Sequence, residues 1–173
     1  MEHKTFYKAG KKKVKRKPKR RTSQQIRSDW INLCLCLWGL AIVKRDGCCQ
    51  WCGGKKCGNA RVGGHHIVAR KLTQGCKLAY FDLDNGMALG WYCHDNIKHE
   101  TDEYIEFRNE WLAAKGLNYK SMRATYGVIS KLPLCDIKLN FNVLRAKCEG
   151  MQIPYTENKT YQRLVNRLAK CNL

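Results

Sequence analysis

The sequence predicts an α+β fold in which helices surround a small centre of tight turns and short strands. Apolar residues recur at helical spacing in the first third of the chain and again in its second half. Between them, residues 46–99 are rich in glycine and cysteine, which favour turns and short strands. With 173 residues, 44% of them hydrophobic, the chain can form a core but is short enough to benefit from a further cross-link.

Positive charge dominates the chain, and it is unevenly distributed. The net charge is +19, and residues 1–21 hold eleven Lys or Arg against the single acid Glu2. This segment has few apolar anchors, so we expect a disordered arm, used either to bind phosphates or as a solubilising or nuclear-address tail. The remaining chain is also basic, which favours a polyanionic partner, and nucleic acid is the common one.

The first ordered element is predicted to be a helix that begins at Thr22 and ends near Arg45. Thr22 and Gln25 have the spacing of a capping box. Apolar residues then follow at helical spacing, namely Ile26, Trp30, Leu33, Leu37 and Leu40. We expect this helix to lie in the core.

Three further helical regions are predicted after the glycine- and cysteine-rich stretch. Thr101 can cap a helix that stops at Gly116, and a second helix covers Tyr119–Lys131 before Pro133. Residues 133–173 contain helix, a break at "GMQIPYTEN", and helix again. The chain is therefore divided into an arm (1–21), a central domain (22–132) and a C-terminal helical module (133–173).

The cysteines are predicted to bind metal. Eleven cysteines cannot all pair with one another, and the polybasic N-terminus has no apolar segment typical of a signal peptide behind it. The longest apolar stretch, Trp30–Val43, is 14 residues, short of the roughly 20 that span a bilayer. We therefore expect a cytoplasmic protein without a membrane segment, in which clustered thiols are metal ligands.

Cys49-x-x-Cys52 has the spacing of a knuckle whose two thiolates grip one Zn²⁺ from a tight turn. Gly53 and Gly54 would allow the backbone to turn tightly directly after the knuckle. Among the distant cysteines, Cys93 is the best candidate for a third ligand and Cys57 for the fourth. The zinc would be structural.

The order of motifs from residue 38 to residue 110 resembles that of the HNH endonucleases, which cut nucleic-acid backbones with a ββα-metal finger. The lead-in "VKRDGCCQWCGG" is followed by "HHI", by "DNGMALGWYCH", and by a histidine nine residues after an asparagine. The resemblance implies a general base at His66 and a residue at Asn85 that orients it. It also implies that His65 and His94 bind one catalytic divalent ion, such as Mg²⁺ or Mn²⁺.

One position departs from the family pattern. Members with a zinc clamp usually carry a second Cys-x-x-Cys around the last strand, and here Gly90 stands at the first of those cysteines. Cys57 is the ligand that we expect instead, and Cys48 and Cys76 are alternatives.

Two residues near the implied site are further candidates. His99, five residues after His94, is a candidate for a further ligand or a phosphate contact, although such a histidine is more often exposed on a helix. Arg70, four residues after His66, is a candidate phosphate clamp.

The C-terminal stretch "FNVLRAKCEGMQIPYTENKTYQRLVNRL" resembles helix-extension-helix and SAP-like DNA-binding modules. Tyr161 stands where those modules usually have a lysine near the start of the second helix. Basic residues nevertheless follow one helical face, namely Lys159, Arg163, Arg167 and Lys170. The alternative is a helical hairpin that only packs on the central domain.

These resemblances imply a metal-dependent endonuclease that hydrolyses DNA phosphodiester bonds to leave 5′-phosphate and 3′-hydroxyl ends. Small nucleases of this kind are typical of phages and mobile elements, and "EYIEFRNEWLAAKG" resembles phage recombination nucleases that cut branched DNA. The alternative is a zinc-stabilised nucleic-acid-binding protein that does not cut. The sequence leaves open whether the substrate is DNA or RNA, which sequence or structure is preferred, and whether one strand or both are cut. It also leaves open the oligomeric state, a homodimer included.

Overall fold

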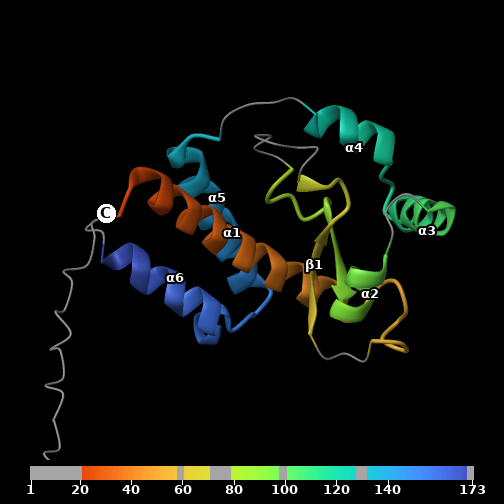
Figure 1. Ribbon diagram of the computed structural model, residues 1–173, viewed down its shortest axis with the longest axis horizontal. Helices are drawn as coiled ribbons and strands as arrows, with labels where there is room; N and C mark the ends of the chain where they lie inside the picture. The colour runs from red at the N-terminus through yellow and green to blue at the C-terminus, as the bar shows by residue number, and fades with distance from the viewer. Residues whose placement is uncertain (1–20, 58–60, 71–78, 98–100, 128–131, 171–173) are drawn as a thin grey trace, which may run out of the picture.

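The computed structural model describes residues 21–57, 61–70, 79–97, 101–127 and 132–170 (Figure 1). Over these residues the protein is α+β, as predicted, with six α-helices and one two-stranded antiparallel sheet. In chain order the elements are α1 (Ser23–Asp46), β1 (Val62–His66), β2 (Gly86–Gly90), α2 (Trp91–Asn96), α3 (Asp102–Ala113), α4 (Tyr119–Tyr126), α5 (Leu134–Gly150), the 3₁₀ turn η2 (Tyr155–Glu157) and α6 (Lys159–Ala169).

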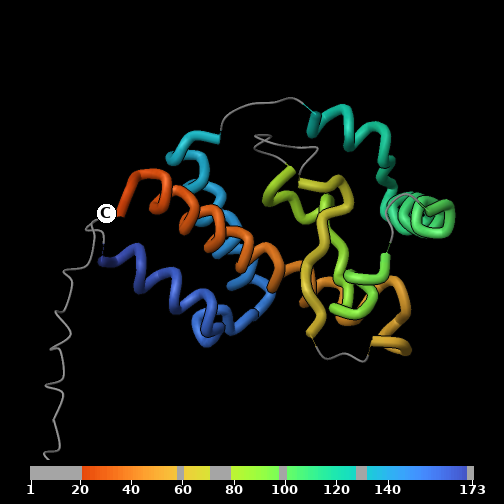
Figure 2. Tube along the Cα trace, in the orientation of Figure 1, coloured from red at the N-terminus to blue at the C-terminus, as the bar shows by residue number. Residues whose placement is uncertain are grey.

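Helix α1 is the central element of the fold, with α5 and α6 packed along it and the sheet near its C-terminal end (Figures 1 and 2). The predicted capping box is confirmed, because the Thr22 hydroxyl accepts from the Gln25 backbone and the Gln25 side chain accepts from the Thr22 backbone. The buried face of the helix consists mainly of Leu33, Cys34, Leu37, Trp38, Ala41 and Ile42.

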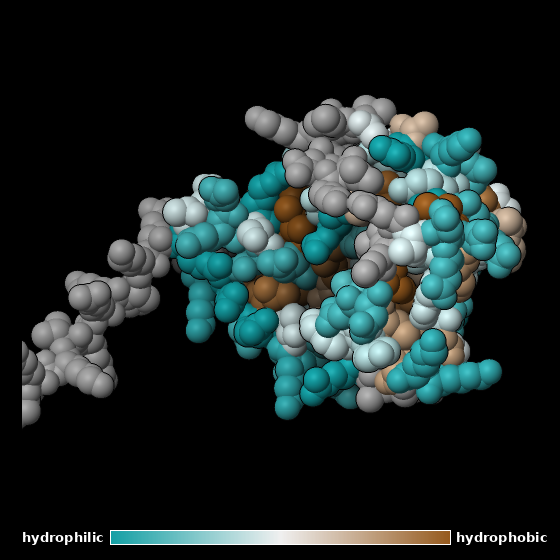
Figure 3. Space-filling view, turned by 45° about the vertical axis from the view of Figure 1, so that its right-hand side comes forward, coloured by the Kyte–Doolittle hydropathy of each residue, from teal (hydrophilic) through white to brown (hydrophobic). Residues whose placement is uncertain are grey.

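By length and mean hydropathy, α1 could also cross a membrane. Its apolar stretch Trp30–Val43, however, is shorter than the roughly 20 residues that span a bilayer. Helices α5 and α6 pack along one face of α1, and the buried carboxylate of Asp29 lies within this helix. These features are compatible with a core helix of a soluble protein. Figure 3 shows one face of the molecule, where hydrophilic side chains surround a hollow in which hydrophobic ones gather.

The two strands pair in a register that places glycine under α1. His65 pairs with Met87, Gly64 with Ala88 and His66 with Gly86. A Cβ atom on Gly64 would lie 2.7 Å from the Trp38 ring, and one on Gly86 would lie 2.6 Å from the same ring. The absence of these two side chains therefore allows α1 to lie directly on the sheet.

The C-terminal end of α1 is hydrogen-bonded to the second strand and the loop before it. The Asp46 carboxylate accepts from the Ala88 backbone N–H at 2.8 Å. The Arg45 guanidinium donates to the carbonyl oxygens of Leu83 at 2.7 Å and Gly86 at 2.6 Å. These bonds fix the position of the strand that leads into α2.

Helices α5 and α6 share a core with α1. Leu164 and Leu168 of α6 pack against Leu33 of α1. Near the start of α1, the buried Asp29 carboxylate forms ion pairs with Arg21 and, at 3.9 Å, with Arg167 of α6. Arg21, the last residue of the predicted arm, is thus bound to a buried carboxylate, and residues 1–20 lie outside the described part of the chain.

For the later helices, the predicted first residues match the structure more closely than the predicted last residues do. Thr101 caps α3 as predicted, its hydroxyl accepting from the Tyr104 N–H at 3.4 Å. Asn158 caps α6 by accepting from two backbone N–H groups of the first turn. Helix α4 starts at Tyr119 as predicted but ends at Tyr126, before the predicted end at Lys131, which lies outside the described residues.

Candidate functional site

Four cysteines from three parts of the chain form one cluster. The Sγ atoms of Cys49, Cys52, Cys57 and Cys93 all lie within 4.8 Å of one another, so the four cysteines predicted as zinc ligands do come together. A tetrahedral Zn²⁺ with Zn–S bonds of about 2.3 Å requires sulfur–sulfur separations of about 3.8 Å. The cluster is therefore of the right size and composition to hold a metal such as zinc. Cys48 is not part of it, and Cys76 lies outside the described residues.

The turn that follows the first two cysteines has the backbone that the knuckle requires. Gly53 and Gly54 have φ values of 57° and 83°, a region that residues with a side chain rarely adopt. The Gly53 N–H donates to the Cys49 carbonyl at 2.8 Å, and the Gln50 N–H donates to Ala88 of β2 at 2.8 Å. The second bond fixes the knuckle to the sheet.

The pKa values of three thiols in the cluster are shifted in different directions. Burial acts to raise the pKa of Cys52, but hydrogen bonds from the backbone of Lys56 and Cys57 and from neighbouring thiols outweigh it and lower the pKa to about 6. Burial and the neighbouring sulfurs raise the pKa of Cys57 to about 11, and the same causes raise that of Cys93. Four thiolates this close are stable together only around a cation.

His65 and His94 are brought together from the sheet and from the helix that follows it. Their ring centroids lie 5.0 Å apart, with the rings nearly perpendicular. His65 is 6% exposed, whereas about half of the His94 side chain is accessible. The Tyr104 hydroxyl of α3 lies 3.4 Å from Nε2 of His65, and burial raises the pKa of Tyr104 to about 12, so this hydroxyl keeps its proton.

His66 faces the other side of β1, toward α1. Its ring stacks on the Trp38 ring with a centroid separation of 4.0 Å and an angle of 15°. Nε2 of His66 donates to the Tyr80 carbonyl at 3.2 Å, so in the neutral ring Nδ1 is the nitrogen that can accept a proton. Burial, with a smaller contribution from the positive charge of Arg70, lowers the pKa of His66 to about 4.

Asn85 is fully buried and binds backbone groups in the two segments that follow the histidine pair. Its Oδ1 accepts from the Val68 N–H at 2.8 Å, and its Nδ2 donates to the Ala79 carbonyl at 2.8 Å. These bonds act on the segments next to His66, since Ala79 precedes the Tyr80 carbonyl that the imidazole binds. The hydrogen bonds of the Asn85 side chain therefore go to backbone groups, and none of them reaches the His66 ring.

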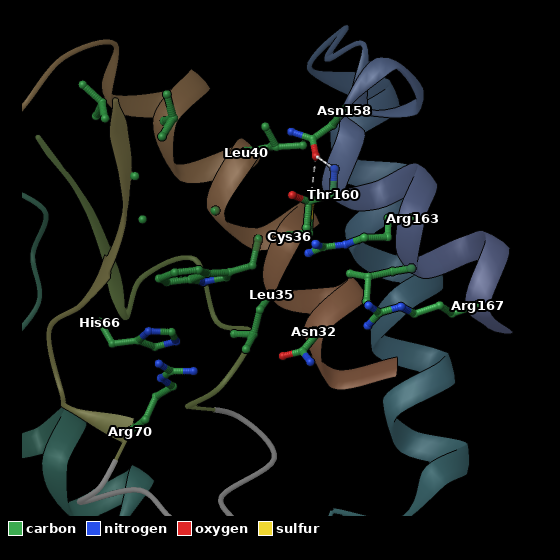
Figure 4. Close-up of a pocket in the computed structure, with 17 residues that line it drawn as sticks. Asn32, Leu35, Cys36, Leu40, His66, Arg70, Asn158, Thr160, Arg163 and Arg167 are labelled. Carbon is green, nitrogen blue, oxygen red and sulfur yellow. Dashed lines mark hydrogen bonds between the residues drawn. The ribbon is translucent and has the colours of Figure 1, made fainter. Parts of the chain in front are cut away.

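A cavity of about 690 Å³ lies between β1, α1 and α6, and His66 is part of its wall (Figure 4). Arg70 lies beside His66, and Arg163 and Arg167 extend from α6 on the opposite side. Lys159 and Lys170, predicted on the same face of that helix, do not line the cavity. His99 lies outside the described residues.

Sequence reasoning missed three residues that support these groups, namely Trp38, Tyr80 and Tyr104. Each acts across at least 14 positions of the chain, and Tyr80 acts through its backbone carbonyl. Only Trp38 had a usable signal, because it lies next to Leu37 on the buried face of a predicted core helix. In comparisons with known proteins, no family model, no curated protein and no solved structure matches the chain.

Proposed function

We propose that this protein is a metal-dependent endonuclease of the HNH type that hydrolyses DNA phosphodiester bonds to 5′-phosphate and 3′-hydroxyl ends. The observation that carries the proposal is the division of two adjacent histidines between two faces of one strand. His65 meets His94 on one face, and His66 faces the cavity on the other. The elements β1, β2 and α2 also follow one another in the order that a ββα-metal finger requires.

In this proposal His66 is the general base. Its lowered pKa keeps the imidazole neutral at pH 7, and the bond from Nε2 to Tyr80 directs Nδ1 as the acceptor. Nδ1 takes a proton from a water molecule as the water oxygen bonds to phosphorus. The bond from phosphorus to the 3′ oxygen breaks, and that oxygen leaves with the electron pair.

His65 and His94 would hold the catalytic divalent ion. Two imidazoles 5.0 Å apart between centroids, one of them half accessible, fit an ion that must also contact a substrate phosphate. When bound, the ion supplies positive charge that stabilises the pentacovalent transition state and the departing oxygen. Tyr104 orients His65 through its hydroxyl, as the outer partner of a metal-binding histidine usually does.

The cysteine cluster would hold a separate, structural zinc ion. All four ligand positions are cysteines, which leaves no open position for a substrate. The cluster joins the knuckle after α1 to the helix that carries His94, because Cys93 is one of its members. Zinc there would keep the metal-binding helix in place against the strands.

DNA is the proposed substrate because the chain is strongly basic both in the arm and in the remaining residues. The proposed location is the cytoplasm of a bacterial or phage-infected cell, where thiols stay reduced. None of the cysteines within the described ranges forms a disulfide.

A plasmid-nicking assay tests the proposal. Purified full-length protein is freed of loosely bound divalent ions by gel filtration and incubated with supercoiled plasmid, with no added metal, with Mg²⁺ or with Mn²⁺. The proposal predicts metal-dependent nicking by the wild-type chain and none by His66→Ala at equal DNA binding. Binding without cutting under every metal condition would instead support the non-catalytic zinc-stabilised nucleic-acid-binding protein.

A further inference from the structure

We infer that the cavity between β1, α1 and α6 seats the sugar-phosphate backbone and bases of one unpaired DNA strand next to His66. The inference rests on the proposed function for the nature of the ligand. It goes further by assigning the C-terminal helix a position in the substrate site. This cavity, which residues of β1, α1 and α6 line, is called the strand groove below.

The charge of the strand groove suits a phosphate backbone. Three arginines line it, namely Arg70 beside His66 and Arg163 and Arg167 on α6, of which Arg167 also pairs at 3.9 Å with the buried Asp29 carboxylate (Figure 4). Among the described residues that line it, none is acidic. The arginines lie on two opposite walls, so successive phosphates of one strand can contact both the sheet side and the helix side.

Helix α1 gives the strand groove an apolar side. Leu35, Leu40 and Val43 are half-buried residues of α1 that line it, and Leu164 of α6 lies opposite. Unpaired bases expose faces that a duplex hides by stacking, and those faces can pack against apolar side chains. The combination of arginines and aliphatic side chains therefore fits a strand with accessible bases.

The size of the groove favours one strand over two. Its volume of about 690 Å³ lies within the range of about 300–1,000 Å³ that holds a single small ligand. A nucleotide or two of one strand can fill such a space. The strand would run from His66 along α1 toward the N-terminal half of α6.

Alkylation of Cys36 can locate the strand. The Cys36 thiol lines the strand groove, whereas Cys135 at the start of α5 is exposed and does not. Full-length His66→Ala protein is treated with iodoacetamide with and without a saturating single-stranded deoxyoligonucleotide, and the modification of both cysteines is followed by mass spectrometry. We expect the single strand to slow Cys36 alkylation at least fivefold and to leave Cys135 unchanged, and we expect the corresponding duplex to protect neither.

A matched pair of variants on α6 tests the phosphate contact. Arg163→Gln removes a charge that lines the strand groove, and Lys159→Gln removes an equal charge one turn away that does not. Affinity for the single-stranded oligonucleotide should fall about tenfold in Arg163→Gln, as expected for one charge-assisted hydrogen bond. The slope of log affinity against log salt should flatten by about 0.7 in Arg163→Gln and remain nearly unchanged in Lys159→Gln.

The inference is overturned if Cys36 is alkylated at the same rate with the single strand bound, or if the two variants lose affinity equally. Equal protection of Cys36 by duplex would overturn the assignment to one strand. The alkylation experiment uses a variant without the proposed base, and neither binding measurement needs an added divalent ion. A failure of the protein to cut DNA would therefore leave them intact, and the two proposals fail separately.

Discussion

Cys57 occupies the space that a side chain at position 90 would need. A Cβ atom on Gly90 would lie 2.3 Å from the Cys57 Sγ atom and 2.7 Å from its Cβ atom. Glycine at position 90 and cysteine at position 57 are therefore two parts of one arrangement. The Cys57 thiol, which follows the knuckle in the chain, lies where a side chain at the end of β2 would otherwise lie.

Replacing Gly90 with alanine should displace Cys57 and weaken metal binding by the cluster. Overpacking of this kind costs about 1–3 kcal/mol in the free energy of unfolding, and loss of a zinc ligand would add to that cost. Gly63→Ala is the control, because a Cβ atom there would meet nothing within 4 Å. The zinc content and melting temperature of both variants test this expectation. A full complement of zinc in Gly90→Ala would contradict the role given to Cys57 as a ligand.

Two adjacent cysteines offer a second test of the cluster. Cys49→Ser should lose the zinc ion and unfold the region around β1 and β2, because Cys49 is fully buried within the cluster. Cys48→Ser should keep one zinc ion per chain, because Cys48 is outside the cluster. Metal analysis and thermal unfolding would measure both, and equal zinc loss in the two variants would show that the ligands are wrongly assigned.

Asn85 should be required for the fold around the histidine pair. Asn85→Ala leaves the Val68 N–H and the Ala79 carbonyl without their partner in a buried place, which should cost about 2–4 kcal/mol in the free energy of unfolding. Asn96→Ala removes an exposed side-chain bond to Tyr92 and should cost less than about 1 kcal/mol. Urea unfolding compares them, and similar losses would argue against the role given to Asn85.

The sequence was most informative where neighbouring residues act on one another. The Thr22 capping box, the Thr101 cap and the Cys49-x-x-Cys52 knuckle each depend on groups within three residues, and all were predictable. The choice of Cys57 over Cys48 as a ligand was less secure. That choice depends on how closely Cys57 approaches Gly90. The spacing of residues along the chain does not determine this distance.

The surroundings of the histidines were not predictable, since they depend on the register of the sheet and on packing between distant elements. A shift of one residue in the pairing of β1 with β2 would exchange the faces of His65 and His66. The stacking of His66 on Trp38 requires the close approach that Gly64 and Gly86 permit. Likewise, the pairing of Arg21 with Asp29 depends on a carboxylate that folding buries.

The His66 ring should remain neutral well below the usual pKa of a histidine. Since burial lowers its pKa to about 4 in the folded protein, the unfolded chain binds a proton near pH 6.5 that the folded chain does not. The contribution of His66 to stability is therefore complete above about pH 6.5 and is lost as the pH falls toward 4. An NMR titration from pH 8 to 5.5, with the His66 signal assigned by its absence in His66→Gln, should show no midpoint; one between 6 and 7 would refute the burial argument.

The central claim is that His66 acts as a base while His65 and His94 bind the divalent ion, and metal rescue of cutting tests it most directly. Nicking rates are measured for His66→Ala, His65→Ala and His94→Ala over increasing Mn²⁺, after zinc content and melting temperature have shown that each variant is folded. His66→Ala should bind DNA but cut about 10² to 10⁴ times more slowly at every Mn²⁺ concentration, because no ion replaces the missing proton acceptor. His65→Ala and His94→Ala should recover part of their activity as Mn²⁺ rises. Rescue of His66→Ala with none at His65→Ala would reverse the two roles, and full activity of His66→Ala would contradict the nuclease assignment for this motif.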